Sequence, residues 1–149
     1  MNNVDTIIEH AESYCQNNGT RLTAKRKLVL SALIQSEKAL SAYDVIDLCK
    51  QEFNENIPAM SVYRILEFLE TEKLVHKLKL ANKFVACSHI TCGHEHDVPQ
   101  FLICGKCDDV KEISIKKSIL TELEQNVENA GFQLVSPQLE MDCICTNCV

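Results

Sequence analysis

The chain has 149 residues, a net charge of −6 and 46% hydrophobic residues, enough apolar material for one ordinary domain or two small ones. This composition argues against a disordered chain, and no run of about 18 apolar residues is present to span a membrane. The first residues lack the basic start and apolar core of a secretory signal, so a cytoplasmic protein is expected.

The cysteine count and the distribution of charge narrow the choice of function. Nine thiols are an odd number, and a reducing compartment does not favour disulfides, so metal binding is the leading interpretation. Residues 1–83 carry 11 Lys and Arg against 11 Asp and Glu, whereas residues 84–149 carry 4 against 10. The net charges of the two parts are therefore 0 and −6. Because DNA affinity depends on local charge, the acidic total does not exclude DNA binding by the first part.

Two helices are predicted at the start of the chain. Apolar residues recur at helical spacing from Val4 to Cys15 and stop before Asn17-Asn18-Gly19, which is typical of a helix end. Thr23 is the expected N-cap of a second helix, Ala24 to Ser36. Its inward residues are expected to be Leu28, Leu33 and Ile34. The first turn carries Lys25-Arg26-Lys27, and cations there oppose the helix dipole, which suggests an external anion or, alternatively, a solvated basic turn.

A helix-turn-helix is predicted next. Ser41-Ala42-Tyr43-Asp44 matches a capping box and opens a third helix, and Ser61, after Pro58, is the expected cap of a fourth. The inward residues are expected to be Val45, Ile46, Cys49 and Phe53 in the third helix and Val62, Ile65, Leu66 and Leu69 in the fourth. The short connection 54–59 is of the kind that joins such helices, so the fourth is the predicted recognition helix.

A hairpin and a polar segment follow these helices. Residues 74–80 alternate apolar and polar side chains, and residues 84–87 can pair back on them. Helices followed by such a hairpin make a winged helix. Residues 88–100 are polar, rich in His and Cys and without periodicity, which indicates a hinge or metal-binding loop.

A small second domain is predicted after the hinge. Its expected elements are short strands at 101–103 and 110–114, a helix at about 116–130 and a strand-like segment at 132–140. The helix has Ile119, Leu123 and Val127 on one face and Gly131 as its terminator. The predicted class is α+β, an N-terminal winged helix-turn-helix domain before a small α/β dimerisation domain. The expected boundaries are 1–84 for the DNA-binding domain, 85–100 for the hinge and metal-binding loop, and 101–149 for the dimerisation domain.

Two CxxC pairs are the strongest local signal in the chain. Cys104-Gly105-Lys106-Cys107 and Cys145-Thr146-Asn147-Cys148 together supply the four thiolates of a closed tetrahedral zinc site. The competing interpretation is a redox dithiol, but such motifs occur singly at a strand-helix junction. The pairs therefore predict a structural zinc ion.

A second set of candidate ligands lies around the predicted hinge. It comprises His76, Cys87, His89, Cys92, His94, His96 and Glu112. Each residue alone could be an ordinary surface or core residue, but mixed nitrogen, sulfur and oxygen ligands suit zinc. Their clustering at one domain boundary indicates a metal site that would set the relative orientation of the two domains.

These motifs together resemble the ferric uptake regulator family over nearly the whole chain. The residues that carry the resemblance are Arg21-Leu22-Thr23 with Arg26, Ser61-Val62-Tyr63-Arg64, and the first CxxC followed by Val110-Lys111-Glu112. Two further sets of residues resemble the zinc uptake regulator branch of this family in particular: Ser41-Ala42-Tyr43-Asp44, and Phe68-Leu69 with Val75-His76-Lys77. The resemblance implies a homodimer that represses metal-uptake genes on operator DNA when its sensing metal is bound.

The resemblance also implies roles for individual residues and about two zinc ions per chain. It assigns Cys104, Cys107, Cys145 and Cys148 to the structural zinc. It assigns His76, Cys87, His96 and Glu112 to the sensing zinc, with His94, His89 or Cys92 as substitutes for His96. The residues expected near DNA are Tyr63, Arg64, Ser61, Tyr43, Thr23, Arg26 and Lys25. Arg64 could instead form an interdomain or dimer-to-dimer ion pair.

Three other functions are considered. A sibling regulator could sense iron, manganese or peroxide, although the Cys87 thiolate favours zinc over harder metals. A zinc-buffering or metal-delivery protein would explain the ligands but not the winged helix. No nucleophilic side chain is evidently paired with a general base, so an enzyme is not expected. No membrane association and no small-molecule substrate are expected either. Cys15 and Cys49 suit core packing, and Cys92 and Cys143 have no assigned role.

Overall fold

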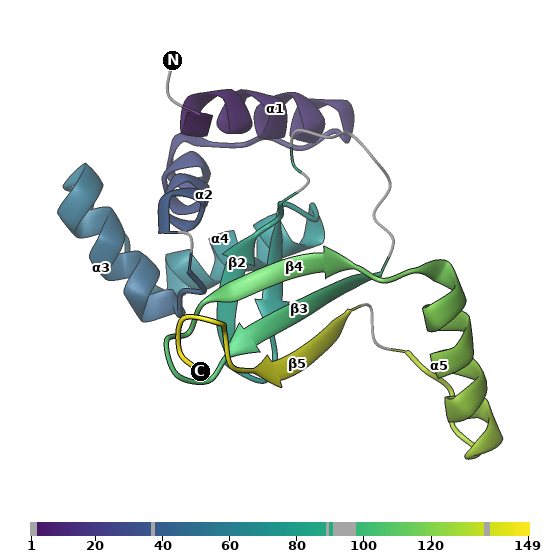
Figure 1. Ribbon diagram of the computed structural model, residues 1–149. Helices are drawn as coiled ribbons and strands as arrows, with labels where there is room; N and C mark the ends of the chain where they lie inside the picture. Colours follow the sequence, from purple (N-terminus) through teal and green to yellow (C-terminus); the bar gives the residue numbers. More distant parts are fainter. Residues whose placement is uncertain (1–2, 37, 89, 91–97, 136–137) are drawn as a thin grey trace. The chain divides into compact units, whose positions relative to one another are not determined.

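The computed structural model describes residues 3–36, 38–88, 90, 98–135 and 138–149. The chain divides into two compact units, Met1–His94 and Glu95–Val149. Helices dominate the first unit and a sheet the second (Figure 1), which confirms the predicted α+β class with a helical domain before a sheet domain. None of the described helices is long and apolar enough to cross a membrane.

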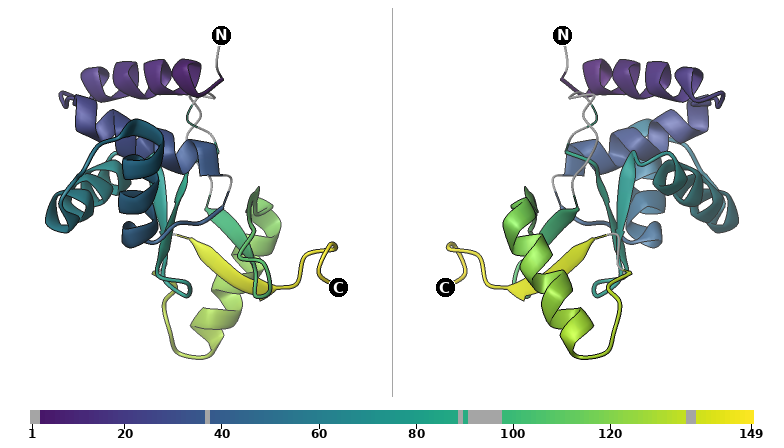
Figure 2. Two further views of the ribbon diagram at one scale, coloured as in Figure 1. Left: turned by 90° about the vertical axis from the view of Figure 1, so that its left-hand side faces the viewer. Right: turned by 90° about the vertical axis from the view of Figure 1, so that its right-hand side faces the viewer.

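The described residues of the first unit form four helices and a β-hairpin. The elements are α1 (Asn3–Asn17), α2 (Ala24–Ser36), α3 (Ala42–Phe53), α4 (Ala59–Thr71), β1 (Val75–Leu78) and β2 (Lys83–Ala86). Helix α2 has the predicted bounds, and Gly19 adopts a φ of 79° at the turn between α1 and α2. Figure 2 shows these helices gathered together, and α2 contacts α1, α3, α4 and β2.

Helix α2 is the central element of the first unit's core. The side chains of Val29, Leu30 and Leu33 are buried, whereas Leu28 and Ile34 are only half-buried. The prediction of an inward-facing residue is confirmed for Leu33 and for Ile34, which packs against the core, but it is wrong for Leu28, which does not belong to that core. A single apolar stripe suits a helix that lies on a protein surface, but α2 has neighbours on several sides and buries a wider surface.

The two helices of the helix-turn-helix begin in different ways. The Ser41 hydroxyl accepts a hydrogen bond from the backbone N–H of Asp44 at 3.1 Å, and the Asp44 carboxylate accepts one from Ser41 N at 3.0 Å, which is the predicted capping box. Helix α4 instead begins at Ala59 with Pro58 as its N-cap, so the expectation that Ser61 caps it was wrong. Pro58 supplies the extended backbone of a helix start, and Ser61 lies inside the first turn.

The inward faces of α3 and α4 agree with the sequence pattern. Val62, Ile65, Leu66 and Leu69 of α4 and Val45 and Cys49 of α3 are buried, and Ile46 and Phe53 are half-buried against the same core. The hydrophobic spacing alone therefore located these faces correctly.

Strands β1 and β2 form the predicted antiparallel hairpin. Val75 pairs with Ala86, and Asn82 takes a left-handed φ of 52° in the turn. The backbones of Leu40 and Phe84 exchange hydrogen bonds of 2.9 and 2.7 Å, which attach β2 to the segment between α2 and α3. Helices and hairpin together make a winged helix.

The second unit is a three-stranded sheet with one helix. Its described elements are β3 (Pro99–Cys104), β4 (Val110–Ser114), α5 (Lys117–Asn129) and β5 (Leu139–Cys143). The strand order is β4-β3-β5, with β3 antiparallel to β4 and parallel to β5. The predicted strand at 132–140 was wrong in its position, because Phe132 and Val135 are 72% and 82% exposed and β5 begins only at Leu139. Pairing with β3, from Gln100 opposite Leu139 onward, decides where β5 begins.

Helix α5 ends as predicted but is not covered as a core helix would be. Gly131 has a φ of 87°, and the N–H of Phe132 donates to the carbonyl of Val127 at 3.0 Å, which is a Schellman ending. No residue of α5 is buried, and Ile119 and Leu123 are 49% and 37% exposed. Figure 1 shows α5 beyond the ends of the strands. Its apolar face is thus uncovered by the described part of this unit.

Candidate metal centres and nucleic-acid interface

Each CxxC pair forms a tight turn at the end of a strand. In the first, which follows β3, the N–H of Cys104 donates to Asp109 O at 2.9 Å and the N–H of Asp108 donates to Cys104 O at 3.0 Å. Asp108 adopts a φ of 61°, which reverses the chain toward β4. In the second, which follows β5, the N–H of Cys148 donates to Cys145 O at 2.9 Å. Turns of this kind aim two sulfur atoms at one point.

Parallel pairing of β3 and β5 brings the two turns together. Cys104 and Cys143 are register partners at the ends of these strands, and the N–H of Gly105 continues the pairing to Cys143 O at 3.0 Å. The Lys106 ammonium also donates to Cys148 O at 3.2 Å, which connects one turn to the other. Segments about 40 residues apart in sequence therefore meet through strand pairing.

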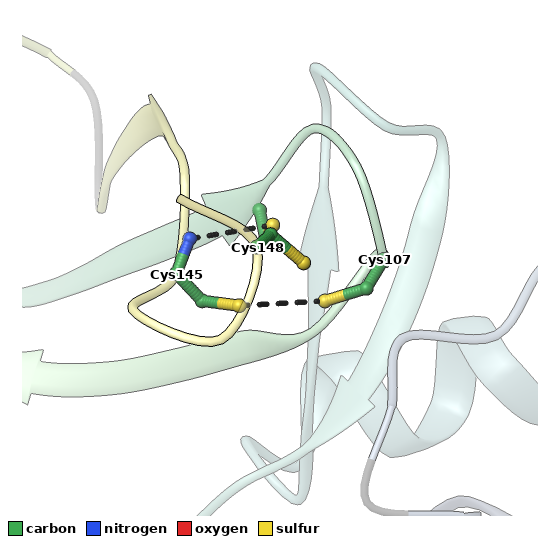
Figure 3. Close-up of side chains that lie close together, drawn as sticks. Cys107, Cys145 and Cys148 are labelled. Carbon is green, nitrogen blue, oxygen red and sulfur yellow. Dashed lines mark hydrogen bonds between the residues drawn. The ribbon is translucent and has the colours of Figure 1, made fainter.

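The geometry of the four thiols fits a zinc ion. The sulfur atoms of Cys104, Cys107, Cys145 and Cys148 all lie within 4.8 Å of one another. Figure 3 shows Cys107, Cys145 and Cys148 converging, and the sulfurs of Cys107 and Cys145 are 3.7 Å apart. A tetrahedron with Zn–S bonds of about 2.3 Å has sulfurs about 3.8 Å apart. The predicted four-cysteine cluster is thus assembled within one unit, with a donor set suited to structural zinc.

The surroundings of these thiols differ from one cysteine to the next. Backbone N–H groups, first that of Cys145 at 3.4 Å and then those of Cys107 and Lys106, lower the pKa of Cys104 to about 6. Hydrogen bonds with the thiols of Cys145 and Cys107 raise the pKa of Cys148 to about 12. The backbone of Asp109 lowers the pKa of Cys107, but the Cys104 thiol, desolvation and the Cys145 thiol together outweigh it and raise that pKa. Without a cation, the cluster therefore favours few thiolates, and a bound zinc ion would replace the remaining protons.

A second pair of candidate ligands lies on the hairpin of the first unit. His76 of β1 is opposite Val85 of β2, and Cys87 is two residues beyond Val85, so His76 and Cys87 share one face of the hairpin. Cys87 N donates to Leu74 O at 2.9 Å and the Cys87 side chain is buried. A ring nitrogen of His76 and the sulfur of Cys87 lie within 4.8 Å of each other. Their distance suits joint ligation of one metal ion.

The remaining predicted ligands of the second site come from the second unit and from the predicted hinge. Glu112 lies in β4 of the second unit, opposite Phe101 of β3, and is half-buried. His89, Cys92, His94 and His96 lie outside the described residues. The completion of this site by Glu112 and a histidine or cysteine of the hinge stays a prediction.

Three of the seven side chains expected near DNA are exposed on α3 and α4. Tyr43 at the start of α3 is 66% exposed, and Tyr63 and Arg64 of α4 are exposed, whereas Ser61 is half-buried. Met60, in the first turn of α4 and 66% exposed, joins Tyr63 and Arg64 on this face. The sequence reasoning missed it because Ser61 was expected to cap the helix, which left Met60 outside it.

The basic first turn of α2 is largely engaged within the first unit. Thr23 caps the helix, since its hydroxyl accepts a hydrogen bond from Arg26 N at 3.4 Å. Lys27 forms an ion pair with Glu12 of α1. The Arg26 guanidinium lies 3.8 Å from the ring centroid of Phe68 and donates to a backbone carbonyl at 2.7 Å. The Lys25 side chain is exposed and, within the described residues, makes no hydrogen bond or ion pair.

The spare thiols that the structure describes fall into two kinds. Cys15 and Cys49 are fully buried in the first unit's core, and burial raises the pKa of both thiols. These two behave as small apolar residues, in line with the expected core packing. Cys143 is half-buried in β5 and does not belong to the four-cysteine cluster.

Known proteins are similar in sequence to this chain over nearly its whole length. Residues 17–142 match the description "Ferric uptake regulator family". The zinc uptake regulation protein of Escherichia coli (strain K12) is 32% identical over 143 residues, which cover 96% of this chain and 81% of that protein. The ferric uptake regulation protein of Helicobacter pylori is 28% identical over 150 residues, which cover 99% of this chain and 95% of that protein.

Solved structures show the same similarity. One is described as a zinc uptake regulator complexed with zinc and DNA, with a TM-score of 0.84 and 27% identity. The match covers 99% of this chain and 96% of that one. The similarity therefore includes both the helical unit and the sheet unit.

Proposed function

The chain belongs to the ferric uptake regulator family, and from that premise we propose that it is a zinc-responsive transcriptional repressor. In this proposal a homodimer binds operator DNA when zinc is bound and controls zinc-uptake genes in the cytoplasm. Membership of a family of regulators agrees with the prediction that the chain is not an enzyme. The zinc effector, the DNA contacts and the dimer each have separate support.

The pairing of His76 with Cys87 on the hairpin is the observation that carries the choice of zinc. The two ligand atoms lie within 4.8 Å on one face of the hairpin. An imidazole and a thiolate suit zinc, whereas iron(II) and manganese(II) sites in proteins are richer in carboxylates and imidazoles. The similarity to zinc uptake regulators agrees with this choice.

The proposed mechanism links zinc occupancy to the orientation of the two units. His76 and Cys87 belong to the winged helix, whereas Glu112 belongs to the sheet unit. Bound zinc would supply the bonds that hold both units to one another, together with His96 or a substitute. The spacing of the two recognition helices in a dimer would then match two half-sites, which raises affinity for a palindromic operator.

The outer surface of α3 and α4 supports the role in DNA binding. Tyr63, Arg64 and Met60 project from the first turns of α4, and Tyr43 projects from the start of α3. Residues near the start of a recognition helix are those that contact base edges in the major groove. We assign base contacts to these side chains and phosphate contact to Lys25.

The exposed apolar surface of the second unit supports the homodimer. No residue of α5 is buried, and its apolar residues Ile119 and Leu123 remain exposed. Further exposed apolar residues of this unit are Ile113, Phe132, Val135, Met141 and Ile144. A second copy that covers α5 would bury apolar surface that the unit alone leaves in water.

The proposed sensing role is tested with Cys87→Ser. Purified wild type should contain about two zinc ions per chain. A mild chelator should remove one of them, and the affinity for duplex DNA should be lost with it. The variant should keep the tightly held zinc and lose the zinc-stimulated binding. Cys143→Ser, which removes a half-buried thiol outside both ligand sets, is the matched control and should respond like wild type. Zinc-stimulated DNA binding by Cys87→Ser would refute the sensing assignment.

The similarity to a ferric uptake regulator keeps iron as the competing effector. Titration of the chelated protein with zinc(II), iron(II) and manganese(II) separates the alternatives, with duplex affinity as the readout. Our proposal expects zinc to activate binding at the lowest free concentration, because the Irving–Williams order and the Cys87 thiolate both favour it. Activation by iron(II) at lower free concentration would reassign the effector.

A further inference from the structure

We propose that Arg26 is a positioning residue, which fixes the recognition helix α4 against the start of α2, rather than a phosphate contact. The inference rests on the proposed DNA-binding function and deepens it. The basic first turn of α2 suggests that all three of its cations contact DNA, but in the structure these side chains have different partners.

The guanidinium of Arg26 is held from two sides within the first unit. Its carbon lies 3.8 Å from the centroid of the Phe68 ring, and Nη1 donates to the backbone carbonyl of Arg21 at 2.7 Å. The residue is half-buried. A planar guanidinium can stack on a ring and donate in its own plane at the same time, whereas a lysine ammonium is a compact point charge that lacks this geometry.

This contact joins the three segments on which DNA recognition depends. Arg21 lies in the segment before α2, Arg26 in the first turn of α2, and Phe68 on α4, one helical turn after Arg64. The i, i+4 spacing of Arg64 and Phe68 means that a rotation or shift of α4 at Phe68 also moves the exposed DNA-facing side chains. The contact thus sets where α4 lies relative to the start of α2.

The two lysines next to Arg26 differ in their contacts. Lys27 forms an ion pair with Glu12, which fastens α2 to α1. The Lys25 side chain is exposed and, in the part of the chain that the structure describes, has no hydrogen bond or ion pair, so it is the cation of this turn suited to a phosphate. Arg26 lies between them in sequence and acts inward. Lys25 and Arg26 therefore make a matched pair for an experiment.

The test measures DNA affinity of the zinc-loaded protein as a function of salt concentration. The probe is a duplex enriched from a random-sequence pool by the wild-type protein, with a scrambled duplex for comparison. A lost phosphate contact lowers the slope of log K against log salt by about 0.9. Lys25→Gln should show this smaller slope. Arg26→Lys and Arg26→Gln should each lose about tenfold in affinity for the enriched duplex, with the wild-type slope.

A second variant separates positioning from simple destabilisation. Phe68→Leu removes the ring but keeps an apolar side chain, and it should lower affinity for the enriched duplex to a similar extent as Arg26→Lys. The double variant should lose little more than either single variant, because both break the same contact. Thermal unfolding checks that every variant is folded at the assay temperature.

Each other outcome of this experiment counts against the proposal. A reduced salt slope in Arg26→Gln, with normal affinity in Arg26→Lys, would make Arg26 a phosphate contact. Additive losses of affinity in the double variant would show that Arg26 and Phe68 act separately. Variants that melt at lower temperature but bind DNA as wild type does would show that the contact only stabilises the fold. Failure of wild-type protein to bind any duplex with zinc would overturn the proposed function itself, which is a distinguishable result.

Discussion

The two units of this chain reach stability by different routes. The first unit has a continuous apolar core drawn from all four of its described helices and the hairpin, with fully buried residues such as Leu30, Leu66 and Leu69. Among the described residues of the second unit, the buried apolar residues are Phe101, Ile103, Cys104 and Ile115, and helix α5 contributes none. About 55 residues with so small a core need a metal ion or a partner chain. A core therefore holds the first unit, whereas we expect zinc ligation and association with a partner chain to hold the second.

Loss of the structural zinc should produce the largest effect and separate the two units. Cys145→Ser removes one of four ligands, and a structural zinc site contributes on the order of 10 kcal/mol to folding of its domain. We expect the second unit to lose its fold and the first to keep its helices. Zinc content and limited proteolysis with mass spectrometry measure the two outcomes.

Cys143→Ser is the control for that experiment, because Cys143 lies two residues away on β5 but outside the cluster. Its zinc content and protease resistance should equal those of wild type. Wild-type resistance of the sheet unit in zinc-free Cys145→Ser protein would contradict the view that the metal holds this unit.

Truncation of one leucine in each unit should give opposite results. Leu66→Ala leaves a cavity in the core of the first unit and should lower its free energy of unfolding by about 2–5 kcal/mol. Leu123→Ala on α5 should change the stability of a single chain little, because Leu123 is 37% exposed, but should weaken dimerisation. Denaturant unfolding and sedimentation equilibrium measure these quantities. Equal losses of single-chain stability in both variants would remove the distinction between the units.

The pH dependence of zinc binding should differ from that of the first unit's core. Near neutral pH the thiols of Cys107 and Cys148, whose pKa values are raised, must each release a proton when zinc binds. Zinc affinity should therefore fall as pH falls, by at least about a hundredfold per pH unit. Below about pH 6 the lowered pKa of Cys104 adds a third proton, and the fall should steepen.

Chelator competition at several pH values on either side of 6 measures this dependence. The buried thiols of Cys15 and Cys49 have raised pKa values and stay neutral throughout, so they should give the first unit no pH dependence in this range. Zinc affinity that is independent of pH would show that the thiols are already ionised before zinc binds.

The smallest expected difference concerns helix starts. Helix α3 has a complete capping box, so Ser41→Ala should lower the stability of the first unit by about 1 kcal/mol. Helix α5 begins after Lys116 with no side-chain cap, so Lys116→Ala should change the stability of the second unit by less than about 0.5 kcal/mol. Thermal unfolding of each variant at fixed zinc concentration makes the comparison.

Features that depend on neighbouring residues were predictable from sequence. The bounds of α2, the capping box at Ser41, the Gly131 ending of α5 and the two CxxC turns all follow from residues within a few positions of one another. The four-cysteine cluster was also predictable, because two knuckles with few alternative partners specify one tetrahedral site. The start of α4 was missed because Pro58 determines it, and a serine three residues later imitates a cap.

The sequence by itself determined the order of helices and strands, the apolar faces of α3 and α4 and the chemistry of the zinc ligands, because backbone and ligand preferences act locally. Only the tertiary structure decided that α2 buries several sides, that β5 begins at Leu139, and that His76 and Cys87 share one hairpin face. It also decided that Arg26 stacks on Phe68. Such outcomes depend on which distant segments pack together, and hydrophobic periodicity carries no information about the identity of the partner.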